Sequence, residues 1–136
     1  MNIFIICSKA FYDRILPVKQ NLEGSGHVIS LPNCFDEPGT EDRYHKMGDK
    51  EHSKWKASML KHSEDVIKQN DAVLVLNFDK NNQKNYVGGA TFLEMYDAFR
   101  LKRKIYMYND IPDGILKDEI EGFEPTLLHQ NLDLIT

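Results

Sequence analysis

Two short apolar runs with no polar alternation constrain the fold of this chain more than any other feature of its sequence. Residues 2–7 read NIFIIC and residues 71–77 read DAVLVLN. Such runs are typical of strands covered on both faces, because a strand with one face in water alternates polar and apolar residues. The sequence therefore predicts a mostly parallel sheet that lies between two layers of helices.

The segments between these runs carry the other signals that such a sheet requires. Helices are expected over residues 9–23, 51–70, 88–103 and 112–120. Pro17 marks either a kink or the first turn of the first helix. Further strands are expected over residues 27–31 and 104–108, with an edge element over 125–134. This alternation indicates a three-layer, Rossmann-like or flavodoxin-like α/β fold of about five strands, with helices on both faces.

Residues 32–50 show no periodicity and are expected to form a long loop. The segment holds two prolines, two glycines and the aromatic residues Phe35 and Tyr44. Loops longer than about 12–15 residues are uncommon in compact domains and often act as lids or binding loops. Both a binding loop and a flexible surface excursion remain open here.

Length and charge narrow the class of protein. The 136 residues fit a single domain spanning positions 1–136. A net charge of −4 argues against a protein that tracks nucleic-acid phosphates. No apolar run reaches the roughly 18 residues of a membrane span, and the first residues lack the basic leader of a signal peptide. Cys7 and Cys34 are expected to be free thiols in a reducing compartment, so we expect a cytoplasmic protein that binds neither nucleic acid nor membrane.

Ligands of such sheets bind where the strands end, at their carboxyl edge. The segments at that edge are residues 8–11, 32–50, 77–89 and 109–110. Ser8 and Lys9 are candidates for contact with a sugar or phosphate, although Ser8 could equally cap the following helix. Asn77 could face the ligand or form a turn.

The most informative acid is Glu94. Gly88 and Gly89 open its helix, and the free N–H groups there favour an anion. The expected apolar face of this helix consists of Phe92, Met95, Tyr96 and Phe99. Glu94 then lies on the opposite side, and no Lys or Arg follows it at i+3 or i+4. It is a candidate nucleophile or base, unless it only stabilises the helix dipole.

The run DAVLVLN, followed by GGATFLEMYDA at residues 88–98, resembles the nucleoside 2-deoxyribosyltransferase family, which includes deoxynucleoside 5′-monophosphate N-glycosidase relatives. The resemblance covers the order of elements over most of the chain. It implies that Glu94 is the nucleophile that attacks the anomeric carbon of a nucleoside or nucleotide. It further implies a homo-oligomer that needs no cofactor and no metal. The implied substrate-binding residues are Ser8, Lys9, Phe11, Asn77, Gly88, Gly89 and Thr91.

Two positions depart from the family pattern. An aspartate is usual where this chain has Gly88, and its absence favours hydrolysis or binding over base exchange. An acid is usual where this chain has Ser63. Asp79 could replace it in protonating the leaving base, although a turn aspartate is the simpler interpretation. The alternative function is a non-catalytic nucleotide-binding or sensing module that retains the pocket.

The remaining candidates are weaker. His45, His52 and His62 lack the spacing of metal ligands and are expected to be solvated. Trp55 is expected in the core or in an oligomer interface rather than beneath a base.

Overall fold

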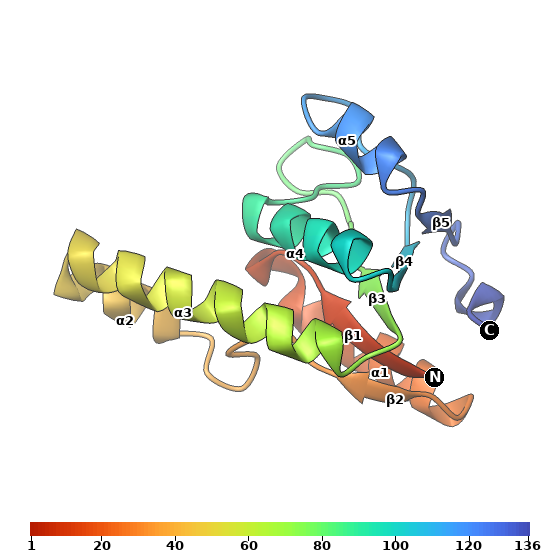
Figure 1. Ribbon diagram of the computed structural model, residues 1–136, viewed down its shortest axis with the longest axis horizontal. Helices are drawn as coiled ribbons and strands as arrows, with labels where there is room; N and C mark the ends of the chain where they lie inside the picture. Colours follow the sequence, from red (N-terminus) through yellow and green to blue (C-terminus); the bar gives the residue numbers. More distant parts are fainter.

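The computed structural model describes residues 1–136 and contains one sheet of five parallel strands. The strands are β1 (Asn2–Ile6), β2 (Val28–Ser30), β3 (Ala72–Val75), β4 (Lys104–Met107) and β5 (Thr126–Leu127). Their order across the sheet is β2-β1-β3-β4-β5 (Figure 1). The predicted three-layer α/β fold with a parallel sheet is confirmed.

The two apolar runs form the centre of the sheet. β1 and β3 pair in parallel, with Ile3 opposite Ala72 and Ile6 opposite Val75. β2 lies next to one edge of β1, and the chain then crosses over so that β3 lies next to the other edge of β1. The loops after β1 and β3 therefore diverge at their carboxyl ends, which is where a parallel sheet of this order leaves room for a ligand.

One face of the sheet is covered by the first helical segment. It consists of the 3₁₀ helix η1 (Lys9–Arg14) and α1 (Ile15–Gly24), so the expected single helix is split. Phe11 and Ile15 pack from this segment against Ile3 and Ile5 of β1. Pro17 lies in the first turn of α1, where its missing N–H leaves no helical hydrogen bond unmade. The 3₁₀ helix η2 (Leu132–Leu134) lies near the C-terminus.

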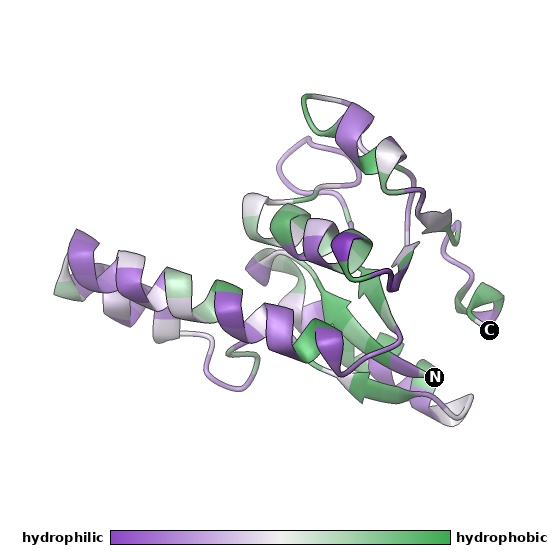
Figure 2. Ribbon diagram, viewed as in Figure 1, coloured by the Kyte–Doolittle hydropathy of each residue, from purple (hydrophilic) through white to green (hydrophobic).

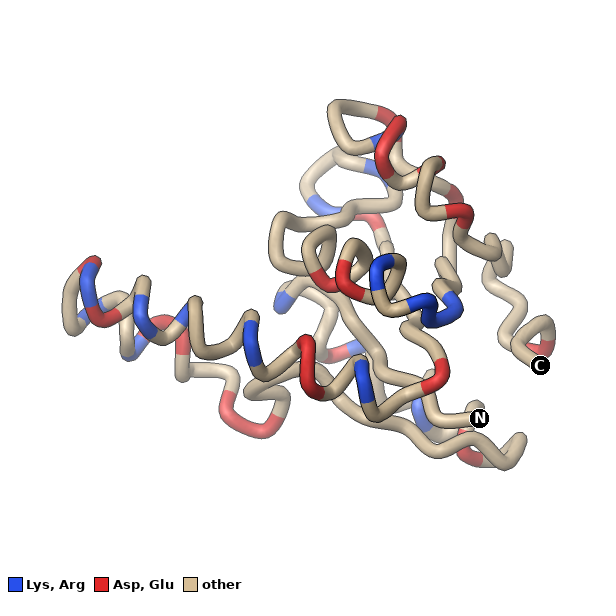
Figure 3. The backbone as a smooth tube through the Cα atoms, in the orientation of Figure 1, with Lys and Arg blue, Asp and Glu red and all other residues tan.

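The opposite face is covered by α3 (Asp49–Lys68), α4 (Gly89–Arg100) and α5 (Lys117–Gly122). Ile67, Met95 and Ile120 come from these helices and are fully buried against the strands. Figure 2 shows the apolar strands between helices that are polar on their outer sides, and Figure 3 shows the acidic and basic residues gathered on those helices and on the loops.

The expected apolar face of α4 is wrong in part. The helix is buried through Thr91, Met95 and Ala98, whereas Tyr96 and Phe99 are close to half exposed. Both aromatic rings instead lie against Phe123, at centroid distances of 6.3 and 5.4 Å. Thr91, Met95 and Ala98 fill the side of the helix that faces the sheet, and the aromatic rings lie at its edge.

The expected loop over residues 32–50 is also wrong in part, because α2 (Thr40–Met47) forms within it. This helix packs along the first half of α3, and the two project together away from the sheet (Figure 1). We call α2 and residues 49–60 the α2–α3 hairpin. A helix that packs only on another helix needs few apolar residues, so the segment carries little periodicity.

Cys7 and Cys34 are both free thiols, as expected. None of the helices combines the length and the apolar character that crossing a membrane requires.

Candidate functional site

A cavity of about 360 Å³ lies at the carboxyl ends of β1 and β3. Its size is within the range of roughly 300–1,000 Å³ that is usual for small-molecule sites. It is lined by the turn after β1, the loop after β2, the inner side of the α2–α3 hairpin, Ser63 farther along α3, Lys80 in the loop after β3, and the start of α4. The cavity is therefore at the edge of the sheet where the sequence predicts a ligand.

Glu94 lines this cavity from α4, and its side chain is half-buried. None of the ion pairs in the molecule includes it. Lys56, the cation that acts on it electrostatically, pairs with Glu41 at 3.2 Å. The carboxylate is thus open to the cavity and carries no neutralising partner.

The surroundings of Glu94 keep its carboxyl protonated up to a higher pH than water would. Burial raises the pKa of this carboxyl from 4.5 to about 7, and the negative charge of Asp97 acts in the same direction. A hydrogen bond from Ser63 and the charge of Lys56 act in the opposite direction. Both protonation states are therefore populated near neutral pH.

Ser63 is a positioned hydrogen-bond donor beneath Glu94. It is only 3% exposed, and its Oγ accepts a hydrogen bond from Asn33 Nδ2 at 2.7 Å. Asn33 is itself fixed, since its Nδ2 donates to the carbonyl of Met59 at 3.1 Å and its carbonyl accepts from the Tyr12 hydroxyl at 3.1 Å. The loop after β2 thus orients the serine, whose own hydrogen is left for the carboxylate.

Cys7 and Tyr12, which also line the cavity, stay neutral. Burial raises the pKa of Cys7 to about 12, and the charge of Glu94 adds to this effect. Burial likewise raises the pKa of Tyr12, and Cys7 and Glu94 contribute after it. Neither residue supplies an anionic nucleophile at neutral pH. Of the other carboxylates that line the cavity, Glu37 is exposed and Glu41 is ion-paired, so Glu94 is its single half-buried, unpaired carboxylate.

The beginning of α4 forms an open, electropositive side of the cavity. Residues 88–91 line the cavity, and no side chain caps the first N–H groups of the helix. A Cβ on Gly89 would meet no atom within 4 Å, so the space in front of this residue is free for a ligand. Lys9 and Lys80 also line the cavity, which adds positive charge to the helix dipole.

The structure places Ser8, Lys9, Gly88, Gly89 and Thr91 around the cavity with Glu94. Ser8 also accepts a hydrogen bond from the N–H of Ala10 at 3.4 Å, so it caps η1 as well.

Three other predicted residues lie outside the lining. Phe11 is a core residue whose ring packs edge-to-face on Phe78 at 5.4 Å. Asn77 is fully buried, and its amide joins the chain after β3 to residues 109 and 110. Asp79 is exposed and accepts a hydrogen bond from the N–H of Asn85 at 3.0 Å. These contacts fit the interpretation of Asn77 and Asp79 as turn-forming residues.

Sequence reasoning missed the wall formed by the α2–α3 hairpin. Glu41, Trp55, Lys56 and Met59 line the cavity from this side. Trp55, expected in a core or an interface, is half-buried in the wall with Tyr44 stacked on it at 5.8 Å. The one available signal was the proposal of a binding loop over residues 32–50. The sequence of α3 does show an apolar stripe through Trp55, Met59, Val66 and Ile67, but it does not show that the first two of these residues face a cavity.

Comparison with known protein families, curated proteins and solved structures finds no match for this chain. Its function has to be argued from the cavity.

Proposed function

We propose that this protein binds a nucleoside or nucleotide in the cavity and cleaves its N-glycosidic bond, with Glu94 as the nucleophile. The observation that carries the proposal is a single half-buried, unpaired carboxylate in a cavity of small-molecule size. The resemblance to the nucleoside 2-deoxyribosyltransferase family points to the same residue. The reaction is either hydrolysis or transfer of the deoxyribosyl group.

The chemistry takes two displacements. A carboxylate oxygen of Glu94 forms a bond to the anomeric carbon while the bond to the base nitrogen breaks, and that electron pair leaves with the base, which takes up a proton. The transition state has oxocarbenium character, so the negative charge of the carboxylate stabilises it. Water, or the nitrogen of a second base, then displaces Glu94 from the glycosyl ester and loses a proton.

The surrounding residues support these steps by position and charge. The Ser63 hydroxyl holds the carboxylate and favours its ionised form. The free N–H groups at the start of α4, with Lys9 and Lys80, suit the 5′-hydroxyl or 5′-phosphate of the substrate. Trp55 and Met59 offer an apolar wall for the base.

A non-catalytic nucleotide-binding or sensing module is the second candidate. Glu41 is the only other half-buried carboxylate in the lining. Although burial acts to raise it, hydrogen bonds from His52 and Lys56 lower the pKa of Glu41 overall. With Glu94 acting as the nucleophile, the cavity therefore holds no second carboxylic acid ready to protonate a leaving base, which favours binding without turnover.

A panel of deoxynucleosides, ribonucleosides and their 5′-monophosphates tests the proposal, with chromatography of the released base. We expect Glu94→Gln to lower the rate by at least about 1,000-fold, the scale on which loss of a nucleophile acts. Glu64→Gln is the matched control, because Glu64 is also half-buried but lies outside the cavity.

Two outcomes of this assay would contradict the proposal. Equal turnover by wild type and Glu94→Gln overturns the assignment of the nucleophile. A ligand-induced rise in melting temperature, with no base released from any substrate, supports the binding module instead.

The pH dependence separates a nucleophile from an acid. Because the nucleophile must be ionised, we expect the rate constant to rise with pH and to level off above the pKa of about 7. A rate that falls through this pH would show that Glu94 donates a proton instead.

A further inference from the structure

The α2–α3 hairpin brings together three metal-ligating side chains that are dispersed in the sequence. Glu41 and His45 lie one turn apart on α2, and His52 faces them from α3. One ligand atom of each residue lies within 4.8 Å of the others. We propose that Glu41, His45 and His52 bind one divalent transition-metal ion of the zinc class.

The geometry needs little adjustment to hold such an ion. Ligand atoms about 2.0–2.2 Å from one zinc ion lie roughly 3.3–3.5 Å apart when they are arranged as a tetrahedron. His52 Nε2 is already 3.0 Å from Glu41 Oε2. The ring centres of His45 and His52 are 3.7 Å apart, and His45 is exposed, so its ring is free to turn.

One oxygen of the Glu41 carboxylate is free to bind an ion. Both partners of Glu41, His52 and Lys56, contact the same atom, Oε2, at 3.0 and 3.2 Å. The other oxygen, Oε1, has no hydrogen-bond or ionic partner. An ion that replaces the contact between His52 and Glu41 can bind either carboxylate oxygen, and binding through Oε1 leaves the lysine in place.

The donor set selects the class of ion. Two imidazoles and one carboxylate suit Zn²⁺ and its neighbours, whereas Mg²⁺ and Ca²⁺ prefer ligand sets made of oxygen. Three protein ligands leave the fourth position of a tetrahedral ion for water or for a group from the cavity. Glu41 lines that cavity, so the ion would lie in the wall of the proposed substrate site.

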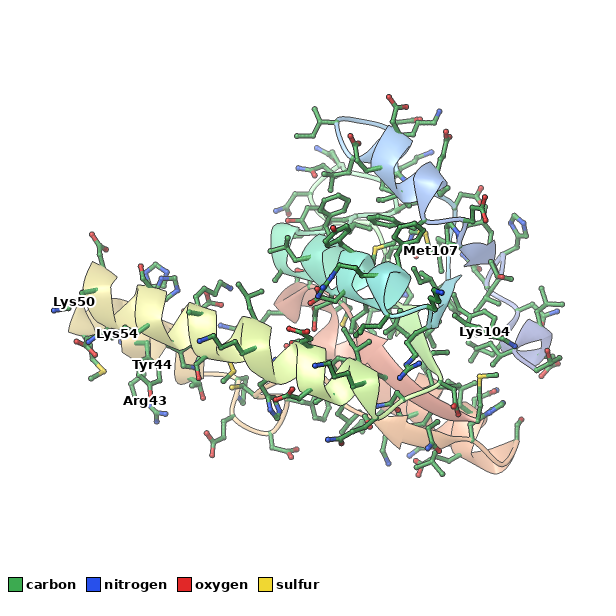
Figure 4. The ribbon with its side chains drawn as sticks, in the orientation of Figure 1. Arg43, Tyr44, Lys50, Lys54, Lys104 and Met107 are labelled. Carbon is green, nitrogen blue, oxygen red and sulfur yellow. The ribbon has the colours of Figure 1, made fainter.

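The hairpin is also the part of the molecule that most needs a cross-link. Thr40 is the only buried residue of α2, and the buried residues of α3, Ser63 and Ile67, lie outside the hairpin. Its helices are held by stacked rings and ion pairs, and Figure 4 shows Tyr44, Arg43, Lys50 and Lys54 at its far end. Structural zinc supplies folding energy where a core is lacking.

The single tryptophan gives a direct reporter, because the Trp55 ring lies 6.0 Å from the His52 ring. We expect Zn²⁺ to change its fluorescence saturably, Cu²⁺ to quench it, and calorimetry to count one Zn²⁺ per chain. A large excess of Mg²⁺ should have no effect. We also expect Zn²⁺ to raise the melting temperature of the wild-type protein.

Variants test the ligands one by one. His45→Ala and Glu41→Gln, neither of which removes the ring beside Trp55, should each weaken Zn²⁺ binding by more than about 100-fold, beyond the usual effect of second-shell changes. His62→Ala is the matched control, because His62 lies on α3, as His52 does, but outside the cluster. His27→Ala is a second control, because His27 Nδ1 lies 3.1 Å from the N-terminal amine and the two could chelate an ion themselves. Both controls should bind like wild type.

Two results would overturn the proposal. One is a full chain that binds no Zn²⁺ by calorimetry. The other is binding that survives in both His45→Ala and Glu41→Gln, or that is lost in either control. Circular dichroism shows whether each variant has folded. Glu94→Gln should bind Zn²⁺ normally, so this test does not depend on the proposed function.

Discussion

The two halves of α3 lie in different environments, although they form one continuous helix of 20 residues. The half that ends at Lys68 packs on the sheet, where Ser63 is 3% exposed and Ile67 is fully buried. The half that begins at Asp49 contains no buried residue and packs on α2. The first environment is a hydrophobic core, and the second is a layer of stacked rings and ion pairs between α3 and α2.

This difference divides the cavity into a firm floor and a weakly held wall. Cys7, Ser63 and Glu94 belong to the floor, which is built on the sheet and on α4. Glu41, Trp55 and Lys56 belong to the wall. Segments with few buried apolar contacts open at lower free energy than a core does. The carboxylate that we propose as the nucleophile is thus held in place, while the side proposed to receive the base is able to adjust.

The largest expected effect comes from the core. Leu74 is fully buried in β3, so Leu74→Ala should lower the free energy of unfolding by about 2–5 kcal/mol. Met47 on α2 is 59% exposed, and Met47→Ala should change the free energy of unfolding by less than about 0.5 kcal/mol. Urea denaturation measures both. Comparable losses would contradict the division into core and hairpin.

Glu94 should make the floor less stable as the pH rises. Its pKa is raised from 4.5 to about 7, so the unfolded chain gives up the proton first and stability falls between these pH values. The full cost, reached above pH 7, is about 3 kcal/mol or less. Glu94→Gln should therefore be more stable than wild type at pH 8 and equal to it at pH 4.

Denaturation of the two proteins at both pH values checks this, with Glu64→Gln as the control. A pH-independent difference between Glu94→Gln and wild type would show that the carboxyl is not held in a raised-pKa environment.

The sequence predicts the sheet-bound part of the molecule well, because burial on both faces leaves a direct pattern. The runs NIFIIC and DAVLVLN became β1 and β3, and the expected position of Glu94 at the ligand edge agrees with the structure. No such pattern exists for the hairpin. Tyr44 and Met47 are the only large apolar residues of α2, too few to reveal a helix.

Side-chain convergence was also beyond sequence reasoning. Glu41 and His45 are an ordinary i, i+4 pair until α3 brings His52 alongside them. The prediction of the buried face of α4 is wrong in part for a related reason. Periodicity shows that a helix has an apolar side, but it does not show what covers that side. In this chain Phe123 covers the aromatic residues only in part.

Replacing Asn77 should have an intermediate effect on stability, and it tests whether this residue is structural. Its buried Oδ1 accepts from the N–H of Asn109 at 2.9 Å, and its Nδ2 donates to the carbonyl of Asp110 at 2.8 Å. Asn77→Ala leaves these groups without partners and should cost about 1–3 kcal/mol of stability. Asp79→Asn keeps an oxygen acceptor for Asn85 and should change stability by less than about 0.5 kcal/mol. Denaturation of both variants decides whether Asn77 is structural, and unchanged stability in Asn77→Ala would return it to the list of candidate ligand contacts.

The smallest expected effect is the most specific for the hairpin. Tyr44→Ala removes the ring stacked on Trp55 and should cost about 0.5–1.5 kcal/mol, confined to the hairpin. Hydrogen exchange should then speed up in α2 and in residues 49–60, while the amides of β1 and β3 keep their protection. Tyr96→Ala is the control, because this half-exposed ring lies on α4 against Phe123 and should leave the hairpin unchanged. If Tyr44→Ala instead loosens the sheet as much as the hairpin, α3 transmits order along its whole length, and the floor and the wall of the cavity are one cooperative unit.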